Sequence, residues 1–226
     1  MPDFAQVWPR PLLVFTKATE GLTMVDNTFS KYFADLKQDG IARGAYHFFR
    51  KAVDAYKQAK HFCDTVRPHI TDKDILVLDV EEGGEKASQL WAWFDHARRQ
   101  FPNNQFMLYS RKNILDPIVM TLAEREYFKD IPVWTAGYPT FPDLYSKPPA
   151  GYIPDQSKFG PVWVWQYSSH GQVQGISGDV DCNWLDPVFA ATLPVPEPPT
   201  QPPAVSTVYV TARVGDRNYA GDIPEV

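Results

Sequence analysis

The sequence predicts an α/β fold organised around a parallel β-sheet. Short apolar runs typical of buried strands alternate with longer segments of helical spacing, and this alternation is typical of βαβ units. We count seven strand candidates, which indicates that the sheet curves into a barrel-like shape. The segments between the late strands lack helical spacing, so we expect loops there instead of helices.

The first half of the chain gives the clearest alternation. A strand candidate at 12–16 ends at Lys17, and a helix candidate at 27–38 is followed by Gly40, a residue typical of helix C-termini. The next helix candidate stops ahead of Pro68, which cannot continue a helix. In order, we expect a short helix at 3–8, a strand at 12–16, a helix at 27–38, a strand at 42–49 and a helix at 52–66.

The second half holds one long apolar strand and then less regular elements. A helix expected at 86–100 carries Leu90, Trp93 and Phe94 on one side and is closed by Pro102. Another helix is expected at 113–126, although it contains Pro117. The remaining strand candidates lie at 75–82, 105–109, 131–135 and 161–167, with a short one around Val180.

The strand at 75–82 is the main candidate for chemistry. Its apolar start runs into Asp79 and Glu81. Because successive strand side chains point to opposite faces, these carboxylates share one face while Val80 takes the other. Paired carboxylates suit glycoside hydrolysis, in which one acid protonates the leaving oxygen and a carboxylate stabilises an oxocarbenium-like centre. On the spacing alone, a strand that ends in solvated acids is the favoured alternative.

Composition indicates one ordinary globular domain with an appendage. The 226 residues are 44% hydrophobic and 22% charged, with a formal net charge of −5, which argues against a nucleic-acid partner. No apolar run approaches the roughly 20 residues of a membrane span, and no signal peptide is visible. Cys63 and Cys182 are expected to be free, buried thiols. The histidines lack metal-ligand spacing, so we expect no metal and no cofactor.

The C-terminal part differs in composition from the rest. Residues 194–203 contain six prolines, which is typical of a stiff, extended linker, and residues 207–214 then alternate like a strand. We therefore expect a main domain at 1–192, a Pro-rich linker at 193–204 and a tail at 205–226. That tail is either a docked or disordered end or the stump of a C-terminal domain.

Six segments between residues 3 and 190 form a pattern that extends beyond the acid-bearing strand. They are KATEG at 17–21 with Asp26, GAYHFF at 44–49, LDVEE at 78–82, PVWTA at 132–136, QYSS at 166–169 and GISGDVDCN at 175–183. Their residues and their order resemble the motifs of glycoside hydrolase family 25, the Chalaropsis-type lysozymes. Each segment alone is a weak signal, but six in the same order are a specific one.

The resemblance implies an irregular TIM-like (β/α) barrel across 1–192. It also implies N-acetylmuramidase activity on bacterial peptidoglycan, at the β-1,4 bond between N-acetylmuramic acid and N-acetylglucosamine. In that family pattern, Glu81 is the general acid, with Asp79 beside it and Asp181 in the same cleft.

Six further residues are candidates for substrate binding. Tyr109 and Trp134 lie near the ends of successive strand candidates, where barrel enzymes gather their ligands. Tyr46 either lines a sugar site or belongs to the core. Lys17 and Glu20 form either a structural ion pair, the favoured role, or part of the cleft floor. Gln166 is added by the resemblance, as the first residue of the fifth segment.

The sequence departs from the family pattern at its beginning. The family's first strand carries an Asp, whereas residues 1–7 resemble what normally follows that strand, so we expect the first strand to be missing. Its neighbours would then have open edges, and the segment 208–214 is the unassigned strand candidate that could pair there.

This departure keeps alternatives to a full lysozyme open. One is an inactive or weakly active glycan-binding remnant. Another is a chitinase-like glycosidase, weakened by the apolar Val77 two residues before Asp79. We expect a monomer that acts on peptidoglycan without a nucleic-acid or membrane partner. It would be either a phage endolysin released from the host cytoplasm or a secreted lysozyme that has lost its N-terminus.

Overall fold

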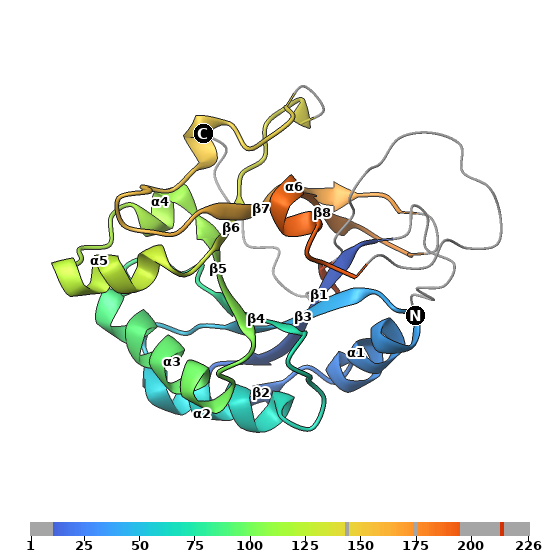
Figure 1. Cartoon of the computed structure of the whole chain (residues 1–226), viewed down its shortest axis with the longest axis horizontal. Helices are drawn as coiled ribbons and strands as arrows, with labels where there is room; N and C mark the ends of the chain where they lie inside the picture. The colour runs from blue at the N-terminus through green and yellow to red at the C-terminus, as the bar shows by residue number, and fades with distance from the viewer. Residues whose placement is uncertain (1–10, 143–144, 174–175, 195–212, 215–226) are drawn as a thin grey trace.

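The computed structural model describes residues 11–142, 145–173 and 176–194 and the backbone of 213–214 (Figure 1). Its strands are β1 (Leu13–Glu20), β2 (Met24–Val25), β3 (Ala42–Phe48), β4 (Ile75–Asp79), β5 (Gln105–Arg111), β6 (Val133–Ala136), β7 (Val162–Gly171), β8 (Val180–Leu185) and β9 (Arg213–Val214). Its helices are α1 (Phe29–Gln38), α2 (Ala55–Val66), α3 (Ala87–Gln100), α4 (Lys112–Leu115), α5 (Leu122–Lys129), the 3-10 helix η3 (Ala150–Tyr152) and α6 (Pro187–Ala190).

The strands form one sheet in the order β2-β1-β3-β4-β5-β6-β7-β8, with β9 paired to β1. From β1 through β3 to β7 every neighbouring pair is parallel, which confirms the α/β class. The sheet is curled like half a barrel. Within the described residues no strand pairing joins β8 to β1, so closure into a complete barrel is not confirmed.

The two ends of the sheet nevertheless share an apolar cluster. Val180 and Cys182 of β8 belong to the same buried cluster as Val14 of β1 and Leu36 of α1. The strand expected at 208–214 is described only at its last two residues, which pair with β1 as β9. The expected helix at 3–8, the N-terminal departure from the family and the residues at 208–212 lie outside the described part of the chain.

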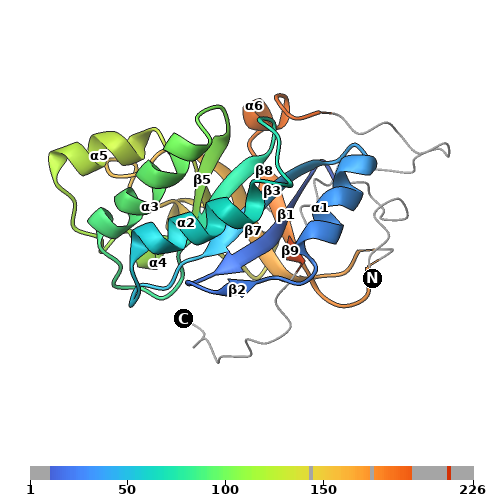
Figure 2. The same cartoon turned by 90° about the horizontal axis from the view of Figure 1, so that it is seen from below.

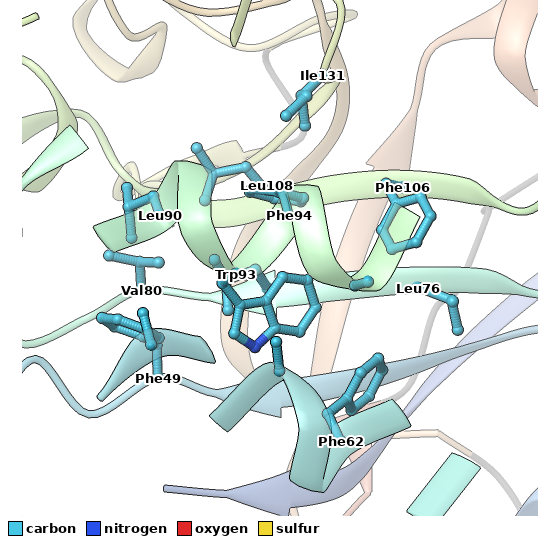
Figure 3. Packing of buried hydrophobic residues seen from close by; sticks show 14 of the residues in the cluster. Phe49, Phe62, Leu76, Val80, Leu90, Trp93, Phe94, Phe106, Leu108 and Ile131 are labelled. Carbon is cyan, nitrogen blue, oxygen red and sulfur yellow. The ribbon is translucent and has the colours of Figure 1, made fainter. Parts of the chain in front are cut away.

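The helices α1, α2 and α3 cover the outer face of the sheet (Figures 1 and 2). Phe62 of α2 and Trp93 and Phe94 of α3 pack with Leu76 and Val80 from the acid-bearing segment in one large buried cluster (Figure 3). Burying a side chain of this size contributes about 1.5–3 kcal/mol, so this layer supplies much of the stability. No helix among the described residues has the length and apolarity needed to cross a membrane.

Local signals explain several of the helix ends. Asp54 caps α2 by accepting a hydrogen bond from the Lys57 backbone N–H at 2.8 Å, and Gly40, with φ 68°, follows α1. The single helix predicted at 113–126 is wrong. It is two helices, α4 and α5, because Pro117 has no N–H to continue the first and Thr121 starts the second as its N-cap.

The late strands differ from expectation in direction. The segments from β6 to β7 and from β7 to β8 contain no α-helix among their described residues, as predicted. However, β8 is six residues long and antiparallel to β7, whereas we expected a short closing strand in a parallel sheet. Cys63 and Cys182 are free and buried, as predicted.

Candidate active site

The acid-bearing strand delivers its two carboxylates to the inner face of the sheet. Asp79 is the last residue of β4 and is buried, and Glu81 follows two positions later with its side chain partly exposed. The apolar neighbours Leu78 and Val80 point to the helix layer. Val77 lies in the separate inner cluster, so strand alternation gives Asp79 and Glu81 the inner face as well.

Asp181 lies on the same face and at the same end of the sheet. It is the second residue of β8, in which Asn183 and Leu185 contribute to the inner side, so alternation turns Asp181 inward too. Because β8 is antiparallel to β7, its first residues lie at the edge where the parallel strands end. The fold therefore gathers three carboxylates at one end of the inner face.

An aromatic layer lies below these carboxylates. Trp134 of β6 donates from its indole Nε1 to Asn183 Oδ1 at 2.7 Å, which ties β6 to β8. Its ring stacks on Phe15 of β1, with centroids 4.4 Å apart, and meets Tyr109 of β5 edge-on at 4.5 Å. Sequence reasoning missed Phe15 and Asn183 as members of this layer, although Asn183 ends the sixth family-like segment.

The other predicted substrate-binding residues belong to the same layer. The Tyr109 hydroxyl donates to Gln166 Oε1 at 2.7 Å, and Tyr46 of β3 is buried in the inner cluster. The structure brings Tyr46, Tyr109, Trp134 and Gln166 together. Each of these side chains is 2% exposed or less, so they form a floor whose surface is largely covered.

A charged network joins the ends of β1, β3 and β4. Lys17 binds Glu20 at 2.8 Å, so the predicted ion pair is present. Arg50 donates to Glu20 and, at 2.8 Å, to Glu82. Both cations also lie over the Phe48 ring, at 5.1 Å for Lys17 and 4.6 Å for Arg50. Arg50 was missed from the sequence; its place directly after a strand candidate is the signal that could have found it.

This network keeps the two glutamates ionised. Burial alone would raise the pKa of Glu20, but hydrogen bonds from Lys17 and Arg50 outweigh it and hold that pKa below its ordinary value. Burial would likewise raise the pKa of Glu82, and hydrogen bonds from Arg50 and the Lys51 backbone lower it instead. The rim of the sheet beside Glu81 is therefore a fixed pattern of charges.

A buried hydrogen-bond chain supports this rim from the helix side. His47 Nδ1 lies 2.7 Å from Thr19 Oγ1 and its Nε2 lies 3.2 Å from Gln58 Oε1. Gln58 in turn accepts from the Arg50 backbone N–H at 2.8 Å and donates to the Arg50 carbonyl at 2.9 Å. Burial lowers the pKa of His47 to about 3, so the ring is neutral and acts as a structural spacer.

The described residues give no sign of a metal centre. Within them, no group of three or more His, Cys, Asp or Glu side chains is arranged to hold an ion.

A comparison with protein families finds a match over most of the chain. Residues 2–176 match the family described as glycosyl hydrolases family 25. The chain belongs to this family. The matched range includes Asp79 and Glu81, whereas β8 with Asp181 follows the end of the range.

Two curated relatives are similar to this chain over three-quarters of its length. Lysozyme M1 of Streptomyces globisporus is 31% identical over 195 residues, which cover 75% of this chain and 58% of that protein. The uncharacterized protein YegX of Escherichia coli strain K12 is 33% identical over 177 residues, covering 75% of this chain and 57% of its own length. This family 25 chain thus spans about half the length of the curated relatives it matches.

Solved structures agree on the fold. The bacterial lysozyme from Streptomyces coelicolor superimposes with a TM-score of 0.63 at 26% identity, covering 82% of this chain and 86% of that one. The muramidase from Acremonium alcalophilum gives a TM-score of 0.61 at 24% identity, covering 84% and 91%. The second likeness, at its lower identity, supports the family 25 fold alone.

Proposed function

We propose that this protein is a peptidoglycan hydrolase, an N-acetylmuramidase that cleaves the β-1,4 bond between N-acetylmuramic acid and N-acetylglucosamine. What carries the proposal is the placement of Asp79, Glu81 and Asp181 at one end of the inner face, inferred from strand alternation and the direction of β8. Membership of family 25 and the similarity to lysozyme M1 support the same activity.

The surroundings of the carboxylates support different roles. Glu81 lies beyond the strand end and is partly exposed, so it can reach a glycosidic oxygen, and it donates the proton to the leaving group. Asp79 is buried and held at the end of β4. Asp79 and Asp181 stabilise the positive charge that develops at the sugar and orient its acetamido group.

The aromatic floor and the charged rim position the substrate. The floor consists of the nearly buried side chains of Tyr46, Tyr109, Trp134 and Gln166. These residues contribute to substrate binding mainly by maintaining the shape of the inner face beneath the sugar. Lys17 and Glu20 act at the rim, where the ion pairs of Glu20 with Lys17 and with Arg50 fix the loop ends around the acids.

The direct test replaces the acid with its amide. Glu81→Gln keeps the shape of the side chain but cannot donate a proton, so clearing of a cell-wall suspension should fall roughly 100- to 10,000-fold. Glu126→Gln, on the outside of α5, removes the same charge without touching the site and should clear walls at the normal rate. Thermal unfolding of both proteins should match the parent. Near-normal clearing by Glu81→Gln would remove Glu81 from the acid role.

The same assay separates the alternatives. A glycan-binding remnant would sediment with cell walls but leave their turbidity unchanged. A chitinase-like enzyme would release reducing ends from chitin oligosaccharides faster than from peptidoglycan. The inward-facing Val77, where an additional acid would extend the carboxylate run, weighs against that second alternative.

The place of action is a separate proposal. Endolysins, among them ply40 from Listeria phage P40, have the same fold at 20% identity. The protein acts on peptidoglycan either as an endolysin released from the host cytoplasm or as a secreted lysozyme. In both cases it acts as a monomer and needs no cofactor.

A further inference from the structure

Arg111 stands at the same end of the inner face as the three carboxylates. It is the last residue of β5, two positions after Tyr109, which lies opposite Asp79 in the register of β4 and β5. Strand alternation therefore gives Arg111 the face of Tyr109, just as it gives Glu81 the face of Asp79. The Val80 backbone N–H still bonds to the Tyr109 carbonyl at 3.0 Å, so the two strands remain adjacent where they leave the sheet, about 4.8 Å apart.

The Arg111 side chain is held in place by an aromatic ring. Its guanidinium lies over the Tyr138 ring, 5.3 Å from the centroid. Tyr138 follows β6 and is 39% exposed, so this stack lies at the molecular surface. Among the described residues, the buried Nε of Arg111 has no hydrogen-bond partner, and no described carboxylate forms an ion pair with its guanidinium.

Other arginines of the chain are used differently. Arg43 binds Asp74, Arg50 binds Glu20 and Glu82, and Arg99 binds Asp95. These guanidinium groups complete ion pairs within the protein. Arg111 keeps its charge and its fork of donors available at the end of the sheet that carries the candidate acids.

A ring-held guanidinium is suited to binding a carboxylate. It is always charged, and its planar fork matches a carboxylate with two parallel hydrogen bonds. Stacking on Tyr138 limits the conformations of the side chain, so less entropy is lost when a ligand binds. A neutral sugar has no anionic group that could form an ion pair with this guanidinium.

We propose that Arg111, stacked on Tyr138, is a substrate-binding residue that takes a carboxylate attached to the N-acetylmuramic acid unit. This inference rests on the proposed function and names the part of the substrate that sets specificity. The carboxylate belongs to the lactyl group in stripped glycan strands and to the stem peptide in intact peptidoglycan. Chitin-type chains carry neither group.

The experiment compares Arg111→Gln and Arg111→Lys with the parent on three ligands. Intact peptidoglycan and glycan strands stripped of peptides by an amidase are substrates for kcat/KM, and chitohexaose is a neutral binding probe. A hydrogen bond to a charged group contributes about 1.5–3 kcal/mol, so Arg111→Gln should lower kcat/KM roughly 10- to 100-fold on a carboxylate-bearing substrate. Arg111→Lys keeps the charge without the fork and should lose less.

The matched control is Arg98→Gln. Arg98 also lies over a tyrosine ring, that of Tyr127, at 5.3 Å from the centroid, but it belongs to the outer helix α3. This control should match the parent on every ligand. A loss at Arg111→Gln on both substrates means that the site takes either carboxylate. A loss on intact peptidoglycan alone assigns the stem peptide, and a loss on stripped strands alone assigns the lactyl group. Each of these outcomes supports the proposal. Unchanged kcat/KM on both, or an equal loss of chitohexaose binding, overturns it.

Failure of the proposed function would be recognised separately. In that case the parent protein itself would release no reducing ends from either substrate. Binding of stripped strands, measured by calorimetry, then tests Arg111 without any cleavage. A dissociation constant raised roughly 10-fold or more in Arg111→Gln supports the carboxylate site, and an unchanged constant overturns it.

Discussion

The two faces of the sheet bury side chains for different purposes. On the outer face, Leu76 and Val80 join a cluster of aliphatic and aromatic residues that runs the length of the helix layer. On the inner face, Val77 is apolar, but the next inward residues are Asp79 and Glu81. The outer face is therefore mostly apolar, with the His47 hydrogen-bond chain as an exception, whereas the inner face changes from apolar to charged along the acid-bearing segment. Stability is concentrated on one side of the sheet, and the proposed chemistry lies at the end of the other.

Two buried tryptophans show this contrast in a single residue type. Trp93 of α3 stacks near His47, with centroids 5.9 Å apart, and its Nε1 has no hydrogen-bond partner among the described residues. Trp134 on the inner face donates its Nε1 hydrogen to Asn183. In the outer layer tryptophan contributes through the size and shape of its ring, whereas in the inner layer it also contributes a directional hydrogen bond.

Removing the outer ring should have the largest effect on stability. Trp93→Ala deletes a fully buried side chain and should lower the free energy of unfolding by about 3–5 kcal/mol, measured by urea denaturation. Cell-wall clearing per folded molecule should not change, because Trp93 does not reach the inner face. A specific loss of activity in fully folded protein would contradict this separation of the faces.

The pair of tryptophan-to-phenylalanine variants tests the directional bond. Trp134→Phe removes the hydrogen bond to Asn183 and should cost about 1–3 kcal/mol beyond the loss of volume. Trp93→Phe loses a similar volume but no hydrogen bond, and it serves as the matched control. Equal losses of stability in the two variants would mean that both faces select tryptophan for shape alone.

Acid should weaken the helix side through His47. Burial lowers the pKa of this ring from its ordinary value of 6.5 to about 3. Below pH 6.5 the unfolded chain therefore binds a proton that the folded protein does not. Stability falls as the pH drops from 6.5 towards 3, by at most about 1.4 kcal/mol per pH unit. His47→Asn should flatten this slope in unfolding experiments between pH 6.5 and 5, and an unchanged slope would show that other groups cause it.

The smallest effect is expected at the charged rim. The pKa of Glu82 is lowered, so the ionised side chain stabilises the fold above its unfolded value near 4.5, and this contribution is lost as the pH falls through the folded pKa. Because Arg50 and Glu82 are about one-quarter exposed, Glu82→Gln should cost less than about 1 kcal/mol at pH 7. The difference from the parent should vanish in acid, and a difference that persists there would exclude an electrostatic origin.

Hydrophobic periodicity predicted most of the elements. All seven predicted strands are present, because a buried strand is recognisable from the hydrophobic pattern of a few consecutive residues. The helix at 113–126 failed because Pro117 and the cap at Thr121 outweigh an apolar pattern that continues across them. The antiparallel direction of β8 depends on the path of the chain after Gly171. The local sequence does not determine that path.

The candidate site was predicted in the same uneven way. Asp79 ends β4 and Glu81 follows two positions later, so alternation continued past the strand end gave their common face. The bond between Trp134 and Asn183 joins residues 49 positions apart, and the bridge of Arg50 to Glu20 and Glu82 joins three strand ends. Such contacts follow from the curvature of the sheet and could not be predicted from spacing.

The sheet also has a consequence for how the protein is made on the ribosome. From β4 to β8, each strand pairs with the strand synthesised just before it. Low sequence separation between partners favours rapid folding, and N-terminal segments emerge first. The sheet can therefore grow strand by strand during translation. On this order, Asp79 and Glu81 are in position before β8 is made, and Asp181 arrives with β8, the last strand of that series. The nascent chain therefore lacks its full set of carboxylates until β8 has been synthesised.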